Sequence, residues 1–166
     1  NREELFTAMY EVGAWLNERR INCSQTETLS ESVVATGFPF RDFSFAEQYM
    51  PTLDYAINNT RGVRRLGAAA LDLAYVASGR FDGFWEFGVQ PWDIAAGCLL
   101  ISEAGGLVSD LSGGEDYLKT GNLIAGTPKI FSQMLQVIDS HRTPALPASW
   151  PSAPIISVRK TTWRAL

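Results

Sequence analysis

The chain has 166 residues, of which 46% are hydrophobic and 19% are charged, and its formal net charge is −4. This length and apolar content suffice for one domain with a sizeable core, and no run of ~20 apolar residues predicts a membrane-spanning helix. The basic residues are scattered outside the C-terminal tail except at Arg61, Arg64 and Arg65, which we expect to form a solvated or dimer-facing edge, so the charge pattern argues against direct binding to nucleic acid.

In chain order, the hydrophobic pattern and the turn residues predict alternating strands and helices. The predicted elements are strands at 5–10 and 14–17, a turn at 17–21, a strand at 31–36, a helix at 45–57, a strand at 63–66, a helix at 68–78, a strand at 82–86, a helix at 92–104, strands at 107–110 and 122–126, and a helix at 128–138. Pro51 is expected to kink or divide the helix in which it lies. The alternation supports an α/β layered domain.

The cysteines and the histidine limit the possible chemistry. Cys23 is predicted in a loop and Cys98 inside a buried helix, without metal-binding spacing, which favours free thiols and a reducing cytoplasm. His141 is the single histidine and is predicted to lie outside the fold, which leaves no Ser–His or Cys–His nucleophile and little basis for zinc chemistry. Carboxylates remain as candidate functional groups, and their oxygens favour hard cations such as Mg²⁺.

The most informative segment is PWDIAAGCLLISEAGG at residues 91–106. The proline and the paired glycines mark the two ends of a helix over 92–104. Small residues at 95–97 would let another backbone pack closely, and the apolar run at 99–101 predicts burial on nearly all sides. Asp93 would then be held rigidly in the first turn, although an aspartate there also fits a plain N-cap.

This segment resembles the second signature of the inositol monophosphatase family, the magnesium-dependent, lithium-inhibited sugar phosphatases. RRLGAAALDLAYVASGR at 64–80 and DGFWE at 82–86 resemble the bacterial extragenic-suppressor branch of that family, and the resemblance runs from about residue 4 to residue 138. It implies a five-layered αβαβα sandwich with a mixed sheet flanked by helices, of which this chain would be the C-terminal half. It also implies a homodimer.

The family's acidic signature, Asp-Pro-(Leu/Ile)-Asp-Gly-(Ser/Thr), and the Gly-Glu-Glu segment before it are absent from the sequence. Since these supply most of the family's metal ligands, we expect the chain to be part of a longer enzyme and to be inactive alone. Residues 1–24 would be the last strands of the N-terminal half, residues 25–140 the C-terminal α/β domain, and residues 141–166 a flexible Pro-rich tail. One short strand at 155–158 is the alternative for that tail.

The resemblance places substrate contacts at Gly67, Ala68, Ala69, Glu86 and Asp93. Gly67 lies where a strand turns into a helix, so N–H groups of the helix start could face an anion or a hydroxyl, although a plain tight turn would look the same. The glutamate matching Glu86 accepts hydrogen bonds from ring hydroxyls in the family, but a polar rim residue would show the same pattern. Asp93 would bind a Mg²⁺ ion near the leaving group and a substrate hydroxyl.

Three further residues are interpreted separately. Family members commonly carry Ser or Thr at the position of Ala68, and the loss of one hydrogen bond, worth about 0.5–1.5 kcal/mol, could shift substrate preference. Glu103 is expected on the helix surface and Asp110 at a strand end, both outside the site.

The sequence therefore predicts a Mg²⁺-dependent phosphomonoesterase that hydrolyses inositol monophosphate or related polyol phosphates. In the family, two or three ions neutralise the phosphate and activate water, without a covalent phosphoenzyme. The alternative is a regulatory protein-interaction module, because the extragenic-suppressor branch is implicated in transcription and ribosome biogenesis through protein partners. An inactive remnant is a third possibility.

Overall fold

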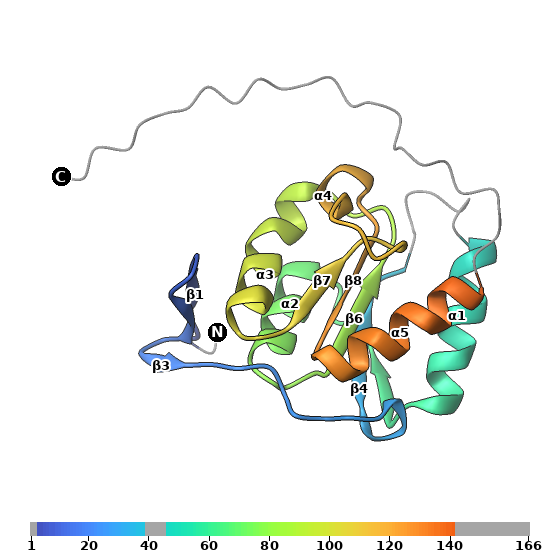
Figure 1. Ribbon diagram of the computed structural model, residues 1–166, viewed down its shortest axis with the longest axis horizontal. Helices are drawn as coiled ribbons and strands as arrows, with labels where there is room; N and C mark the ends of the chain where they lie inside the picture. The colour runs from blue at the N-terminus through green and yellow to red at the C-terminus, as the bar shows by residue number, and fades with distance from the viewer. Residues whose placement is uncertain (1–2, 39–45, 142–166) are drawn as a thin grey trace.

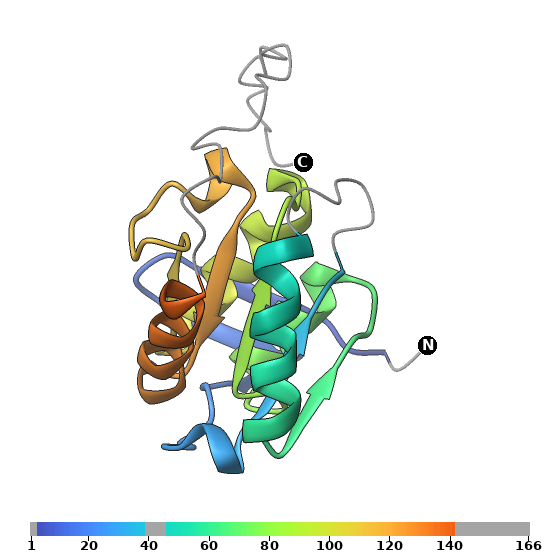
Figure 2. The same cartoon turned by 90° about the vertical axis from the view of Figure 1, so that its right-hand side faces the viewer.

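The computed structural model describes residues 3–38 and 46–141, which form four layers of strands and helices (Figure 1). A five-stranded sheet lies between two pairs of helices, and a three-stranded sheet lies on the outer side of one pair (Figures 1 and 2). The predicted α/β layered architecture, with helices flanking a mixed sheet, is confirmed. The tail predicted over residues 141–166 lies outside the described residues except for His141, and the domain limits at residues 24 and 140 remain predictions.

The three-stranded sheet is antiparallel, with the strand order β1-β2-β3. Its strands are β1 (Phe6–Met9), β2 (Gly13–Leu16) and β3 (Arg19–Arg20). Because side chains alternate along a strand, Phe6 and Ala8 share one face, and both pack against the hydrophobic cluster around α2 and α3. The first two strands agree with the prediction within one residue at each end, whereas β3 lies where the sequence predicts only a turn.

The five-stranded sheet has the strand order β5-β4-β6-β8-β7. Its strands are β4 (Val33–Thr36), β5 (Gly62–Arg64), β6 (Gly83–Glu86), β7 (Leu107–Ser109) and β8 (Leu123–Gly126). β4 pairs in parallel with β5 and β6, whereas β8 pairs antiparallel with β6 and β7. The carboxyl ends of β4, β5 and β6 therefore meet at one edge of the sheet, the kind of edge where open α/β sheets bind ligands.

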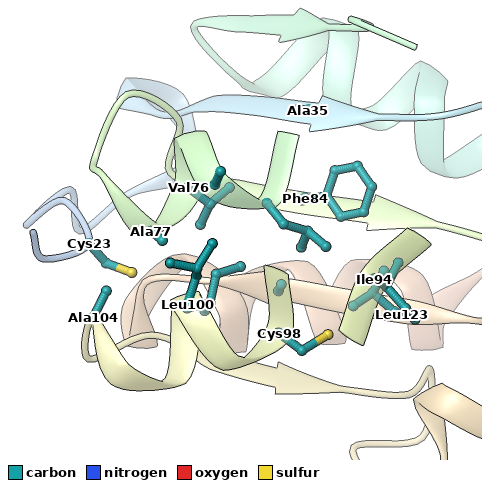
Figure 3. Packing of buried hydrophobic residues seen from close by; sticks show 14 of the residues in the cluster. Cys23, Ala35, Val76, Ala77, Phe84, Ile94, Cys98, Leu100, Ala104 and Leu123 are labelled. Carbon is teal, nitrogen blue, oxygen red and sulfur yellow. The ribbon is translucent and has the colours of Figure 1, made fainter. Parts of the chain in front are cut away.

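Two pairs of helices cover the faces of this sheet (Figure 2). They are α2 (Ala69–Ala77) with α3 (Pro91–Glu103) on one face, and α1 (Ala46–Asn59) with α5 (Pro128–Ser140) on the other. Phe84 points into the cluster beneath α2 and α3, which also contains Ile94 and Leu123 (Figure 3), and its neighbour Trp85 points into the cluster beneath α1 and α5. Both faces of β6 are thus buried, so this strand is rigidly held.

Helix α3 confirms the helix predicted over 92–104 within one residue, but its burial differs from the prediction. A Cβ atom on Gly97 would lie 2.5 Å from Leu73 Cβ on α2, so close packing at this glycine is confirmed. Burial on nearly all sides is wrong, because Trp92 is 75% exposed and Ala95 and Ala96 are exposed. Ala95 and Ala96 are therefore not packed against another helix or strand among the described residues.

Several local predictions change in the folded chain. His141 does not lie outside the fold, because it caps the C-terminus of α5, with its Nδ1 2.8 Å from the Val137 carbonyl oxygen and its ring 6.3 Å from the Tyr55 ring. Pro51 lies inside α1, which continues through it as one helix, so the predicted division is not found. The short elements η1 (Leu29–Glu31) and α4 (Tyr117–Thr120) were too brief for a periodic pattern to predict.

Both cysteines are free, as predicted, and Cys23 is buried as well as Cys98. Burial raises the pKa of the Cys23 thiol to about 11 and that of Cys98 to about 12, so both remain protonated at neutral pH. Glu103 lies at the end of α3 as expected, where its Oε1 accepts a 2.7 Å hydrogen bond from the Glu11 N–H and so ties the β1–β2 turn to this helix. Within the described ranges, every helix is too short or too polar to cross a membrane.

Candidate functional site

The candidate site lies at the edge of the sheet where β4, β5 and β6 end. Glu86 is the last residue of β6, and Asp93 lies in the first turn of α3. Asp72 lies in the first turn of α2, and Arg65 directly follows β5. The fold thus brings three carboxyl groups and one guanidinium to a single edge, from segments that span almost thirty positions of sequence.

Glu86 is half-buried, and its carboxyl group packs against Gly37, the residue after β4, where only a hydrogen atom fits. Its pKa is raised to about 7, first by burial and then by the negative charges of Asp72 and Asp93, while Arg65 acts in the opposite direction. Near neutral pH this carboxyl group is therefore divided between its two protonation states. It can accept a hydrogen bond from a hydroxyl group or donate one.

Asp72 is the site residue that sequence reasoning missed. It is 1% exposed, and its Oδ1 has no hydrogen-bond partner among the described residues. Burial raises its pKa to about 7, against the opposing effect of Arg65. The available signal was the single acidic residue within the otherwise apolar helix predicted at 68–78.

Arg65 is exposed, as predicted for the arginine cluster, but its position also connects it with the carboxyl groups. Its guanidinium carbon lies 5.5 Å from the centre of the Phe38 ring, and one of its nitrogens lies beside Gly67. The positive charge of Arg65 opposes the increase in the pKa values of Asp72 and Glu86 without cancelling it. This arginine is therefore the cation that offsets the acidic edge.

Gly67, Ala68 and Ala69 form the turn that starts α2. Gly67 has a φ of +87°, a left-handed conformation that favours glycine. Ala68 is the N-cap residue, with extended backbone angles and no side-chain hydrogen bond to the helix. The structure places these residues between the end of β5 and the start of α2, at the same edge as Glu86.

We expect the substitution Ala68→Ser to stabilise the protein by about 0.5–2 kcal/mol, because a hydroxyl at an N-cap accepts a hydrogen bond from a free helix N–H group. Urea unfolding measures this change. Ala70→Ser, inside the first turn of the same helix, is the matched control and should be neutral or slightly destabilising. Equal effects of the two substitutions would contradict the capping argument.

Asp93 is half-buried in the first turn of α3, where its own N–H donates a 2.9 Å hydrogen bond to the Gln90 carbonyl. Gln90 is the N-cap residue, and no side chain caps this end of the helix. The plain N-cap interpretation of Asp93 is therefore wrong, because the helix begins at Pro91 and Asp93 lies three residues past the cap. Among the hydrogen bonds of the described residues, none engages its carboxylate.

A magnesium site is only partly supported by the residues of this edge. Carboxylate oxygens suit Mg²⁺, and Asp93 could supply one ligand. Within residues 3–38 and 46–141, however, no three His, Cys, Asp or Glu side chains are grouped so that they could hold a metal ion. The described residues do not complete a metal centre, and no reaction step through the ion can be derived from them.

Comparison with known proteins decides the family. A model of the inositol monophosphatase family matches residues 2–143. The chain belongs to the inositol monophosphatase family. Nus factor SuhB of Pseudomonas aeruginosa is 48% identical over 147 residues, which cover 87% of this chain and 54% of that relative. Nus factor SuhB of Escherichia coli K12 is 48% identical over 145 residues, with the same coverage of each chain, 87% and 54%.

Solved structures agree with this assignment. The extragenic suppressor protein suhB from Bartonella henselae matches with a TM-score of 0.78 and 44% identity over 82% of this chain and 52% of that chain. An inositol monophosphatase from Anabaena matches with a TM-score of 0.73 and 36% identity over 82% and 54%. The chain spans about half the length of these inositol monophosphatase relatives. The family and the branch inferred from the sequence are confirmed.

Proposed function

We propose that this chain contributes to the active site of a phosphomonoesterase that requires Mg²⁺ and hydrolyses inositol monophosphate or related polyol phosphates. The observation that carries the proposal is the convergence of Glu86, Asp93 and the start of α2 at one edge of the sheet. Membership of the inositol monophosphatase family supports it. The activity, its substrate and its ion belong to the proposal.

Each group at this edge suits one part of such a reaction. The start of α2 presents N–H groups that favour an anion, and Glu86 binds substrate hydroxyls. Asp93 offers one carboxylate to the ion and binds the hydroxyl beside the ester oxygen. When bound, Mg²⁺ would neutralise phosphate charge and lower the pKa of water, and its other ligands must come from outside the described residues.

The substitution Glu86→Gln tests this function in the longer protein that contains the chain. We expect KM for inositol monophosphate to rise about 10- to 100-fold, because a hydrogen bond to a charged group contributes about 1.5–3 kcal/mol. The KM for an aryl phosphate, which has no ring hydroxyls, should rise much less. Phosphate release measures both substrates, and an equal loss for both would remove Glu86 from hydroxyl recognition.

A regulatory role is the second candidate, and the similarity to two proteins named Nus factor SuhB favours it. In this alternative, the chain binds a transcription-related protein and catalyses little. Affinity capture with purified transcription factors and RNA polymerase should then give the same yield for the wild type and for Asp93→Asn. Absence of any such complex would eliminate this candidate.

Three other expectations remain part of the proposal. They are a homodimer, inhibition by lithium and a cytoplasmic location. Sedimentation of the longer protein tests the dimer, and inhibition by LiCl at a fixed Mg²⁺ concentration tests lithium sensitivity. The proposal includes neither direct binding to nucleic acid nor association with membranes.

A further inference from the structure

The connection between β6 and α3 joins the two proposed site residues, Glu86 and Asp93, through residues 87–92. The connection leads directly into the first turn of α3, which carries Asp93. A carboxylate that must share an ion needs a fixed position, because misplacement of a ligand weakens the metal site. The contacts that hold the connection therefore bear on the proposed chemistry.

Two backbone N–H groups of this connection are held by the start of β8. The Gly88 N–H donates a 3.0 Å hydrogen bond to Asn122 Oδ1, and the Val89 N–H donates a 2.9 Å hydrogen bond to the Gly121 carbonyl. Asn122 is 9% exposed, so its side-chain hydrogen bond is shielded from water. Gly121 has a φ of +69°, and a Cβ atom on it would collide with the Val89 carbonyl oxygen.

The segment that delivers Asn122 is itself organised around Asp110. Asp110 Oδ1 accepts hydrogen bonds from the Ser112 N–H at 2.8 Å and from the Gly114 N–H at 2.9 Å. Burial acts to raise the pKa of Asp110, but the hydrogen bonds from Ser112, Gly114 and Asp116 outweigh it and lower the pKa. Asp110 follows β7, as expected, and it gives the loop between β7 and β8 a fixed shape.

We propose that Asn122 is a positioning residue, whose side-chain oxygen, together with the Gly121 carbonyl, holds the 87–92 connection so that Asp93 stays in place for its ion. This inference rests on the proposed function. In this role Asn122 acts through the Gly88 N–H and is not itself a ligand of the substrate or the ion. It is separated from Gly88 by 34 residues in the sequence.

The test compares Asn122→Ala with Asn122→Asp in the longer protein. Alanine removes the acceptor, whereas aspartate keeps Oδ1. For Asn122→Ala we expect faster hydrogen exchange at the Gly88 amide and a roughly 10- to 100-fold higher Mg²⁺ concentration for half-maximal activity, the cost typical of lost outer contacts in metal sites. For Asn122→Asp we expect the exchange rate at Gly88 and the Mg²⁺ requirement to stay close to those of the wild type. The matched control is Asn59→Ala on the exposed side of α1.

Each outcome decides a separate point. An unchanged exchange rate at Gly88 in Asn122→Ala would overturn the inference, since the bond would then hold nothing. Faster exchange with an unchanged Mg²⁺ requirement and unchanged Mg²⁺ binding by calorimetry would overturn it too. Absence of Mg²⁺-dependent hydrolysis in the wild type would instead contradict the proposed function. The role of Asn122 would then still be tested by amide exchange and by calorimetry with Mg²⁺ alone.

Discussion

Replacement of Asp93 by asparagine in the longer protein should lower kcat for inositol monophosphate by roughly 10²- to 10³-fold, the loss seen when one preorganised electrostatic group is removed from an active site. Asparagine keeps the size of the side chain but not its negative charge, so it binds a divalent cation poorly. Because Gln90 caps α3 and Asp93 does not, the substitution removes no side-chain cap from this helix.

The measurement is phosphate release as a function of Mg²⁺ concentration. Asp54→Asn, an exposed carboxylate on α1, is the matched control and should leave kcat unchanged. Thermal unfolding of both variants should stay close to that of the wild type. If Asp93→Asn turns over normally in saturating Mg²⁺, Asp93 does not have the proposed role.

The stability of the protein should fall as the pH rises from about 4 to about 7, and Asp72 should be a main cause. Its pKa is 3.8 in an ordinary environment and about 7 in the folded protein. Between these values the unfolded chain loses the Asp72 proton while the folded chain keeps it, so rising pH favours unfolding. Glu86 acts in the same direction, because its pKa rises from 4.5 to about 7.

The substitution Asp72→Asn removes this dependence, since an amide stays neutral. At pH 8 we expect the variant to be about 1–3 kcal/mol more stable than the wild type, which is less than the full effect of an uncharged group because the amide is itself polar and buried. Near pH 4.5 the two proteins should differ by less than ~1 kcal/mol.

Urea unfolding at the two pH values measures this difference. Glu115→Gln, at an exposed position, is the control and should show no comparable change. A wild type of equal stability at both pH values, together with an asparagine variant that is weaker at both, would contradict the raised pKa. A buried acid that costs stability is consistent with a functional constraint on this edge.

Much of the fold could be predicted from local patterns. Pro91 and the glycines after α3 mark the ends of that helix, because proline suits a first turn and glycine suits a left-handed end residue. Alternating apolar residues predicted most strands, since the two faces of a strand meet different surroundings. Very short elements such as β3 and α4 could not be predicted, because they depend on contacts with distant segments.

The sequence by itself determined the order of the elements, because periodic patterns and turn residues are local. Its resemblance to the inositol monophosphatase family implied the family and the candidate site residues Gly67, Glu86 and Asp93. Only the tertiary structure decided which charges share an edge. The sequence pattern does not distinguish Asp72 from an ordinary helix residue, and its burial follows from the packing of α2 against β6. The tertiary structure also decided that Asn122 reaches Gly88 across 34 residues. Contacts of this kind depend on how segments pack in space, and local sequence patterns carry no information about that packing.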